Sequence, residues 1–189
     1  MALLENEKLF LRALEPEDLD ILYEWENKSE LWKYGSTLAP YSKFALRDYL
    51  TDSLQGILYT RQLRLLAIEK KSSAVTGMVD IFDYEPIHQR AGIGIIVDSP
   101  YRRKGYGTEI LNLTAEYAFD ILHLNQLYAY IPVSNVSSFK LLSKCGYKQA
   151  GLLKSWLKTA NGFEEARLMQ LMKDYKSKRL PNPFVNLPN

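Results

Sequence analysis

The sequence predicts an α+β domain with a mixed, largely antiparallel sheet that carries helices on both faces. The chain has 189 residues, of which 47% are hydrophobic, and this is enough apolar material for one core. Strand-like segments follow one another across short polar turns, which favours antiparallel pairing, and amphipathic helices are placed between them. There is no internal repeat or interdomain linker, so we expect one domain over residues 1–179 and a Pro/Asn-rich tail over 180–189.

The N-terminal part predicts one strand and two helices. Residues 8–14 alternate in polarity and are expected to form the strand. Pro16, with acidic neighbours, is typical of a first helical turn, and the helical spacing continues through Trp25. Residues 34–41 contain Gly, Ser and Pro and are expected as a loop before a second helix at 43–54.

The middle of the chain predicts three strands and the longest helix. Two strands joined by a polar turn are predicted at residues 63–69 and 75–84, and Pro86 is expected to end the second of them. A third strand at 91–97 leads through a short turn into a helix at 105–122, which has one apolar face.

The C-terminal part predicts a strand, a helix and a hairpin. Residues 126–133 form the strand, and the next helix runs to Cys145, where Gly146 stops it. The pair Asn161-Gly162 is a strong signal for a two-residue hairpin turn between strands at 154–158 and 163–172.

Charge and cysteine content exclude several classes of protein. The net charge is +2 and there is no long Lys/Arg block, so we expect no nucleic-acid partner. No apolar run approaches the roughly 18 residues that a membrane span needs, and no secretory leader is evident. Cys145 is the single cysteine, which excludes an internal disulfide and a multi-cysteine zinc site. We expect a cytoplasmic protein without a metal site.

The turn before the long helix has the features of a pyrophosphate site. Gly105 and Gly107 let the backbone approach an anion closely, and the helix start adds unpaired N–H groups and a positive dipole end. Arg102, Arg103 and Lys104 add positive charge at the same place. The P-loop and the Gly-x-Gly-x-x-Gly fingerprint are both absent. Taken alone, such a turn is also typical of a tight connection with solvated basic residues.

The motifs around this turn resemble those of the GNAT superfamily of N-acetyltransferases. Arg102, Gly105 and Gly107 match its Q/R-x-x-G-x-G/A signature, after a Val-Asp-Ser-Pro-Tyr lead-in at 97–101. The segment from Asn135 to Tyr147 resembles the later family element N…A…(Y)-x-K-x-G-F. The resemblance spans about residues 8 to 175.

This resemblance implies a three-layer fold in which two adjacent parallel strands splay apart around acetyl-CoA, the acyl-donor co-substrate. It implies backbone contacts to the pantetheine arm from Ile95, Ile96 and Val97, and a side-chain contact from Asn135. Ser138 and Lys144 are candidates near the same arm. The residues expected at the pyrophosphate are Arg102, Arg103, Lys104, Gly105, Tyr106, Gly107 and Thr108.

The sequence departs from the family at both usual proton-transfer positions. Leu142 stands where many relatives have a tyrosine general acid, and Gly92 stands where many have a glutamate. Replacement candidates are Glu85, His88 and Tyr147. Asp83, near the first two, and Tyr130 are further possibilities, although loop acids and packed tyrosines usually have no catalytic role. Cys145 lies at an apolar helix end, and we expect a structural thiol.

The implied reaction is direct attack of a neutral primary amine on the acetyl thioester in a ternary complex. The chain as a whole resembles bacterial spermidine/diamine N-acetyltransferases, yet residues 37–39, before Pro40-Tyr41, contain no acid to pair with a polyamine. A ribosomal-protein N-terminus, as a peptide amine, and an amino sugar remain open as acceptors. An acyl-CoA-binding sensor with little turnover and a nucleotide-binding protein are alternatives of other classes. A homodimer is compatible with the resemblance, since superfamily members often pair.

Overall fold

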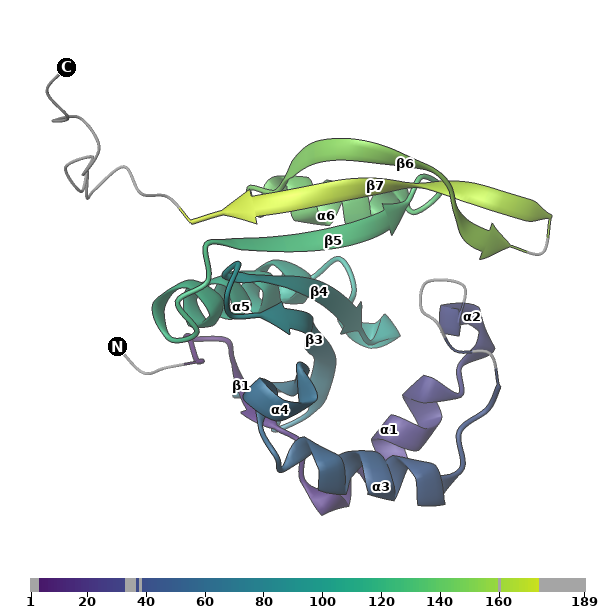
Figure 1. Ribbon diagram of the computed structural model, residues 1–189. Coiled ribbons are helices and arrows are strands. Elements are labelled where there is room, and N and C mark those ends of the chain that lie inside the picture. Colours follow the sequence, from purple (N-terminus) through teal and green to yellow (C-terminus); the bar gives the residue numbers. More distant parts are fainter. Residues whose placement is uncertain (1–3, 33–36, 38, 160, 174–189) are drawn as a thin grey trace, which may run out of the picture.

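The protein is built around one seven-stranded mixed sheet with the order β1-β2-β3-β4-β5-β7-β6 (Figure 1). A computed structural model describes residues 4–32, 37, 39–159 and 161–173. The predicted tail at 180–189 and half of the predicted loop at 34–41 lie outside these residues. Every neighbouring pair of strands is antiparallel except β4 and β5, so the predicted mixed, largely antiparallel sheet is confirmed.

The first four strands follow one another across the sheet and match the sequence prediction closely. They are β1 (Leu9–Ala13), β2 (Leu63–Glu69), β3 (Val75–Glu85) and β4 (Arg90–Val97). The remaining strands are β5 (Gln126–Pro132), β6 (Lys148–Thr159) and β7 (Gly162–Met172), and β7 lies between β5 and β6.

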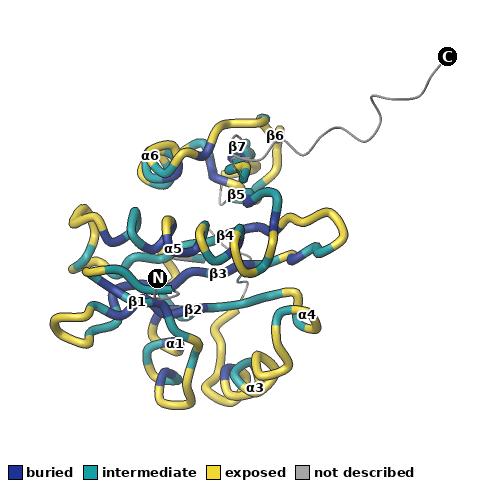
Figure 2. Tube along the Cα trace, turned by 90° about the vertical axis from the view of Figure 1, so that its left-hand side faces the viewer, coloured by how far each residue is buried: buried dark blue, intermediate teal, exposed yellow. Residues whose placement is uncertain are grey.

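Helices cover both faces of the sheet (Figures 1 and 2). On one face, α1 (Leu19–Glu26) and α3 (Lys43–Ser53) bury Leu22, Trp25 and Leu46 against β2 and β3. On the other face, α5 (Tyr106–Asp120) and α6 (Val136–Lys144) share one core with β3, β4, β5 and β7. Short helices complete the chain, namely η1 (Pro16–Asp18), α2 (Ser29–Trp32), α4 (Ile57–Thr60) and η2 (Ser99–Tyr101). The predicted three-layer arrangement is confirmed.

The C-terminal hairpin differs from its prediction in length and in its turn. Strand β6 begins at Lys148, several residues before the predicted start at 154. Its register with β7 shifts between Gln149 and Gly151 and again between Leu153 and Leu157, so the alternation that reveals a strand is broken there. Thr159 pairs with Gly162, so Gly162 begins β7 and is not part of the turn as the predicted Asn161-Gly162 pair had it.

Strands β4 and β5 run side by side for only a short distance. Their register pairs are Arg90 with Gln126, Ala91 with Leu127 and Gly92 with Tyr128. Beyond these pairs β4 continues alongside β3 as far as Val97, and β5 continues alongside β7 as far as Pro132. The two strands therefore part after Gly92 and Tyr128, and we call this point the fork. It confirms the expected splayed parallel strands.

Candidate active site

The turn between β4 and α5 presents unpaired backbone amides at the start of a long helix. Arg103 and Gly105 both have left-handed backbone angles, with φ of 60° and 88°, and this conformation turns successive amides toward one side. The carbonyl of Gly105 accepts the first helical hydrogen bonds, from Thr108 N (3.1 Å) and Glu109 N (3.2 Å). Within the described part of the chain, no group accepts a hydrogen bond from the amides of residues 103–105. With the positive end of α5, they form an anion-binding turn.

Exposed cations surround this turn, and one of them comes from the other end of the chain. Arg102 is fixed by a hydrogen bond of 2.8 Å from its Nε to the carbonyl of Val97, at the end of β4. Lys8 Nζ donates to the carbonyl of Lys104 at 2.5 Å and lies 3.9 Å from the ring centre of Tyr106. Sequence reasoning missed Lys8, because no local pattern links a residue before β1 to a turn 96 positions later.

Tyr106 anchors the turn through its side chain. Its ring is buried and packs edge-on against Tyr101, with centroids 5.2 Å apart. Its hydroxyl donates a hydrogen bond to Glu69, and this bond raises the pKa of Tyr106 to about 12, with burial as a further cause. Only the backbone of Tyr106 is therefore available to a phosphate, whereas its side chain ties the turn to β2.

Gly107 and Thr108 bring the turn, β4 and α6 together. A Cβ atom on Gly107 would lie 2.9 Å from Leu141 Cδ2 and 3.5 Å from Val97 Cγ2. Close packing against α6 thus favours glycine here, in addition to any approach of an anion. Burial raises the pKa of the Cys145 thiol, which lies close to Thr108. A protonated, half-buried thiol agrees with the expected structural role of Cys145.

On the β4 side of the fork, alternate residues direct their backbone groups toward the gap. The carbonyl of Gln89 accepts hydrogen bonds from Asn125 N (2.6 Å) and Gln126 N (3.2 Å), and the carbonyl of Val97 accepts from Arg102. Backbone N–H and C=O groups alternate in direction along a strand. Those of Ile95 therefore point toward the gap, as those of Gln89 and Val97 do, whereas those of Ile96 point toward its partner Met78 on β3. Ile95 and Val97 are therefore the better placed of the three predicted β4 residues.

On the β5 side, the predicted residues lie at the start and the end of α6. Asn135 caps the helix, since its Oδ1 accepts a hydrogen bond from Ser138 N at 3.1 Å. Its amide Nδ2 has no partner among the described residues and is left to donate. Ser138 lies in the first turn, whereas Lys144 is exposed in the last turn, at the other end of the helix.

The two departures from the family pattern have structural counterparts. A Cβ atom on Gly92 would lie 2.3 Å from Phe82 Cε2, so the ring of Phe82 fills the space that a glutamate would need. Leu142 is 1% exposed and belongs to the core between α6 and the sheet. Neither position offers a proton donor or acceptor.

The three candidate replacements occupy two different places. Glu85 and His88 lie at the turn between β3 and β4, where the Glu85 carboxylate accepts a hydrogen bond from Ile87 N at 3.3 Å and His88 is exposed. Tyr147 is 1% exposed in the core next to Leu142, and burial raises its pKa. Its hydroxyl has no hydrogen-bond partner within the described residues. Burial keeps this phenol protonated but encloses it.

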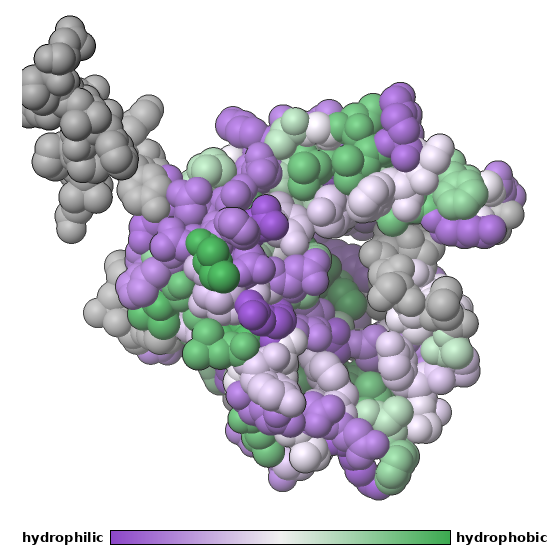
Figure 3. All heavy atoms as spheres, in the orientation of Figure 1, coloured by the Kyte–Doolittle hydropathy of each residue, from purple (hydrophilic) through white to green (hydrophobic). Residues whose placement is uncertain are grey.

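A row of aromatic side chains and one acid lie on the face of the sheet that α1 and α3 partly cover. We call Phe82, Tyr128, Tyr130 and Trp156 the aromatic row, because neighbouring ring centroids are 6.3, 5.5 and 5.8 Å apart. Tyr128 donates a hydrogen bond of 3.3 Å to Asp83. The space-filling view is hollowed between the β5–β7 layer and the α1–α2 side of the molecule (Figure 3). The sequence named Asp83 and Tyr130 but gave no sign of the row, since its members come from three strands.

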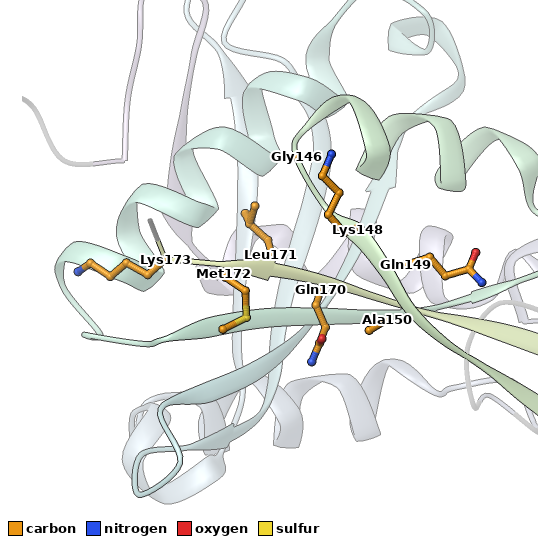
Figure 4. A pocket seen from close by; sticks show the side chains of 8 residues that line it. All are labelled: Gly146, Lys148, Gln149, Ala150, Gln170, Leu171, Met172 and Lys173. Atoms are coloured by element: carbon orange, nitrogen blue, oxygen red, sulfur yellow. The ribbon is translucent and has the colours of Figure 1, made fainter. Parts of the chain in front are cut away.

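A second hollow, of about 560 Å³, lies elsewhere and is open to solvent (Figure 4). It is lined by the start of β6 and the end of β7, including Lys148, Gln170 and Lys173, and contains none of the predicted site residues. In the described ranges no three His, Cys, Asp or Glu side chains are grouped closely enough to hold a metal ion. None of the described helices has the length and apolar character needed to cross a bilayer.

Comparison with known proteins agrees with this geometry. Residues 8–148 match the family described as the acetyltransferase (GNAT) domain. The chain is 28% identical over 148 residues to a spermidine N(1)-acetyltransferase of Vibrio cholerae, covering 78% of this chain and 83% of that protein. A spermidine N(1)-acetyltransferase of Escherichia coli K12 is 27% identical over 143 residues, covering 76% and 74%.

A crystal structure of spermidine N-acetyltransferase from Vibrio cholerae in complex with CoA and spermine superposes with a TM-score of 0.79 at 24% identity, covering 88% of this chain and 96% of that one. This likeness concerns the fold. The alternatives of a sensor without turnover and of a nucleotide-binding protein are not favoured by these matches. The chain belongs to the GNAT acetyltransferase family and is an N-acetyltransferase that uses acetyl-CoA to acetylate an amine.

Proposed function

We propose that the acceptor is a small primary alkylamine of the diamine or polyamine class. Two relatives that match most of this chain are spermidine N(1)-acetyltransferases. The structural observation that carries the proposal is the hydrogen-bonded pair of Asp83 and Tyr128 beside the fork, which offers one carboxylate and aromatic surface to a cationic alkyl chain.

The anion-binding turn and the fork fit acetyl-CoA. The unpaired amides of residues 103–105 and the cations Arg102, Arg103 and Lys104 would hold the pyrophosphate, and the predicted backbone contacts of Tyr106, Gly107 and Thr108 continue this site into α5. Ile95 and Val97 on one strand and the Asn135 amide on the other would hold the pantetheine arm. Ile96, Ser138 and Lys144 are less favourably placed for the same arm.

The chemistry that acetyl-CoA supplies is an acetyl thioester. The Ile95 amide faces the gap, where it would donate a hydrogen bond to the carbonyl oxygen as negative charge develops on it. The acceptor ammonium must first lose a proton, and Glu85 and His88, at the β3–β4 turn beside the paired end of the fork, are candidates for a base or for the start of a water chain. The leaving thiolate has a parent pKa near 8.5, so the absence of a tyrosine at Leu142 is tolerable. We do not assign this role to the enclosed hydroxyl of Tyr147.

Few described carboxylates remain available to a polycation on this face. Glu26 and Asp80 are both bound by Arg64, and residues 37–39 contain no acid. A short acceptor with one additional positive charge is therefore better matched than a longer polyamine.

The proposal is tested by measuring thiol release from acetyl-CoA with 1,4-diaminobutane, spermidine, glucosamine and a peptide with a free N-terminus. We expect the highest kcat/KM with the diamine. Preference for the peptide or for the amino sugar would replace the proposed acceptor class, and no turnover with any amine would support a binding module instead.

Self-association and a cytoplasmic location are further parts of this proposal. Strand β6 is one of the two edge strands of the sheet, and Leu152 and Phe163 on the β6–β7 hairpin are exposed apolar side chains. These features suit contact with a second copy, of which a homodimer is the smallest form. Light scattering coupled to size-exclusion chromatography measures the mass directly, and a monomer at all concentrations would contradict the proposal.

A further inference from the structure

We propose that Asp83 and the aromatic row form a specificity subsite for the acceptor, in which Asp83 binds a second ammonium group while the amine to be acetylated lies at the fork. This inference rests on the proposed function and adds to it the residues that distinguish a diamine from a monoamine.

A β-bulge directs Asp83 toward this site. The register between β3 and β4 passes from Phe82–Gly92 to Glu85–Arg90, so two residues of β3 stand against one of β4. Asp83 adopts a left-handed conformation, with φ of 49°. Phe82 lies over Gly92 on the α1/α3 face, whereas Tyr84 is buried in the core of the opposite face. The bulge thus interrupts the alternation of β3, as bulges beside active sites commonly do.

Tyr128 links Asp83 to the fork. It is the β5 member of the last pair that joins the two parallel strands, and its hydroxyl donates to Asp83 Oδ2. Burial and the nearby charge of Asp83 raise the pKa of Tyr128 to about 12. The phenol therefore stays protonated and stabilises a charged carboxylate at this point.

The carboxylate of Asp83 is available to a cation. It is exposed, and among the described residues no Lys, Arg or His side chain forms an ion pair with it. Arg64, by contrast, occupies the carboxylates of Glu26 and Asp80 on the same face of the sheet. Asp83 can accordingly provide a negative charge at the edge of the fork.

The aromatic row provides the surface for the alkyl chain between the two nitrogens. Tyr130 is 39% exposed and Trp156 is 52% exposed, and both lie on the side where the strands have parted. Residues two positions apart along a strand are separated by about 7 Å. The distance from Tyr128 to Tyr130 is therefore similar to the distance between the two nitrogens of a short extended diamine. Aromatic faces attract ammonium groups and bury methylene groups, so the row suits both parts of such an acceptor.

The test compares 1,4-diaminobutane with 1-aminobutane, which has the same carbon chain and lacks the second charge. Asp83→Asn is expected to lower kcat/KM for the diamine by about 10- to 100-fold, the range for a lost charge-assisted hydrogen bond, and to change the value for the monoamine less than about twofold. The KM for acetyl-CoA should stay unchanged. Glu116→Gln, which changes an exposed acid of α5 on the opposite face of the sheet, is the control and should leave the diamine preference intact.

Two results would overturn the inference. One is an equal loss for both amines in Asp83→Asn, and the other is a diamine preference that persists in this variant. Calorimetric titration of 1,4-diaminobutane into the protein saturated with coenzyme A separates this from the proposed function. No binding to the unmodified protein refutes the acceptor class itself, whereas binding that survives Asp83→Asn refutes only the role of Asp83.

Discussion

Gly92 and Phe82 form a complementary pair in which a glycine on one strand makes room for an aromatic ring on the next. The family resemblance marks Gly92 as the place of a missing glutamate, but it gives no reason for the loss. The structure supplies the reason, because the Phe82 ring occupies the space above the glycine. A glutamate at 92 therefore needs a smaller residue at 82 as well, and the two positions should be treated as one unit.

Gly105 provides a direct test of the anion-binding turn. Gly105→Val forces a β-branched side chain into a left-handed conformation and should disrupt the amides of residues 103–105, so we expect coenzyme A affinity to fall by at least about 100-fold. Isothermal titration calorimetry measures the affinity.

Gly56→Val is the matched control for this substitution. Gly56 has a φ of 79° and open space around it, and it precedes α4, outside the proposed cofactor site. The Gly56→Val variant should lower the free energy of unfolding by a similar amount, about 1–2 kcal/mol, while its affinity for coenzyme A is retained. An equal loss of affinity in both variants would show that strain in the fold, and not the turn, is responsible.

The helices on the acceptor face are joined to the sheet by an ion triad. Arg64 on β2 pairs with Glu26 on α1 and, at 2.6 and 2.9 Å, with Asp80 on β3. The side chains of the three residues are only 12%, 16% and 19% exposed. Tyr49 on α3 packs its ring against the same guanidinium, 5.2 Å from the ring centre.

Arg64→Met should destabilise the fold because it leaves two largely buried carboxylates unpaired. We expect a loss of about 3 kcal/mol in the free energy of unfolding, measured by urea denaturation. Lys43→Met is the control, since the pair of Lys43 with Asp20 is mostly exposed and should contribute little to stability. Similar losses in the two variants would contradict a structural role for the triad.

The contacts of the Asp18 carboxylate, at the junction of β1 and η1, predict that the stability of the fold depends on pH. Burial acts to raise the pKa of Asp18, but the hydrogen bonds from Arg12 (2.6 and 2.8 Å) and from the Glu15 amide (2.8 Å) outweigh it and leave the pKa below its ordinary value of 3.8. A lowered pKa in the folded state contributes stability above the ordinary value, and this contribution is lost as the pH falls toward the folded value.

Asp18→Asn should therefore cost about 2 kcal/mol above pH 5, with the difference from the unmodified protein shrinking as the pH falls below 4. Urea denaturation at several pH values measures it. Glu17→Gln changes an exposed acid in the same turn and serves as the control. A difference that stays constant down to pH 2 would exclude the Asp18 carboxylate as its source.

Elements with a regular pattern could be predicted from sequence, and elements with interrupted patterns could not. The apolar face of α5 and the helix stop at Gly146 gave accurate positions. Strand β6 was largely missed, because its two register shifts interrupt the alternation that marks a strand. The short helices α2 and α4 have only four residues each, too few for a periodic signal.

At the scale of the whole molecule, the sheet consists of two parts that meet at the fork. Strands β1–β4 form one part and β5, β7 and β6 form the other, and the register pairs from Arg90 to Gly92 join them. Only tertiary structure could show that Asp83 and Trp156 lie beside the fork with Tyr128 and Tyr130, and that Lys8 reaches the anion-binding turn, because these residues come from distant places in the chain. The local cofactor motif was readable from sequence because its residues are contiguous.

Coenzyme A binding should slow hydrogen exchange on both sides of the fork. Gln126 N faces β4, and alternation gives Tyr130 the same direction, so the amides of Ile95 and Tyr130 both face the gap. Hydrogen–deuterium exchange with and without coenzyme A should show protection there and at residues 103–105. Protection confined to the hollow at Lys148 and Lys173 would contradict the proposed site.

The short junction also has a mechanical consequence. Because so few backbone pairs connect the two parts of the sheet, a small rotation about the line from Ala91 to Leu127 changes the width of the opening without breaking the ladders within either part. The same rotation moves the core that α5 and α6 share with both parts of the sheet, so this core resists a wider opening. We therefore expect the junction and the core together to limit the length of the acyl chain that the fork admits.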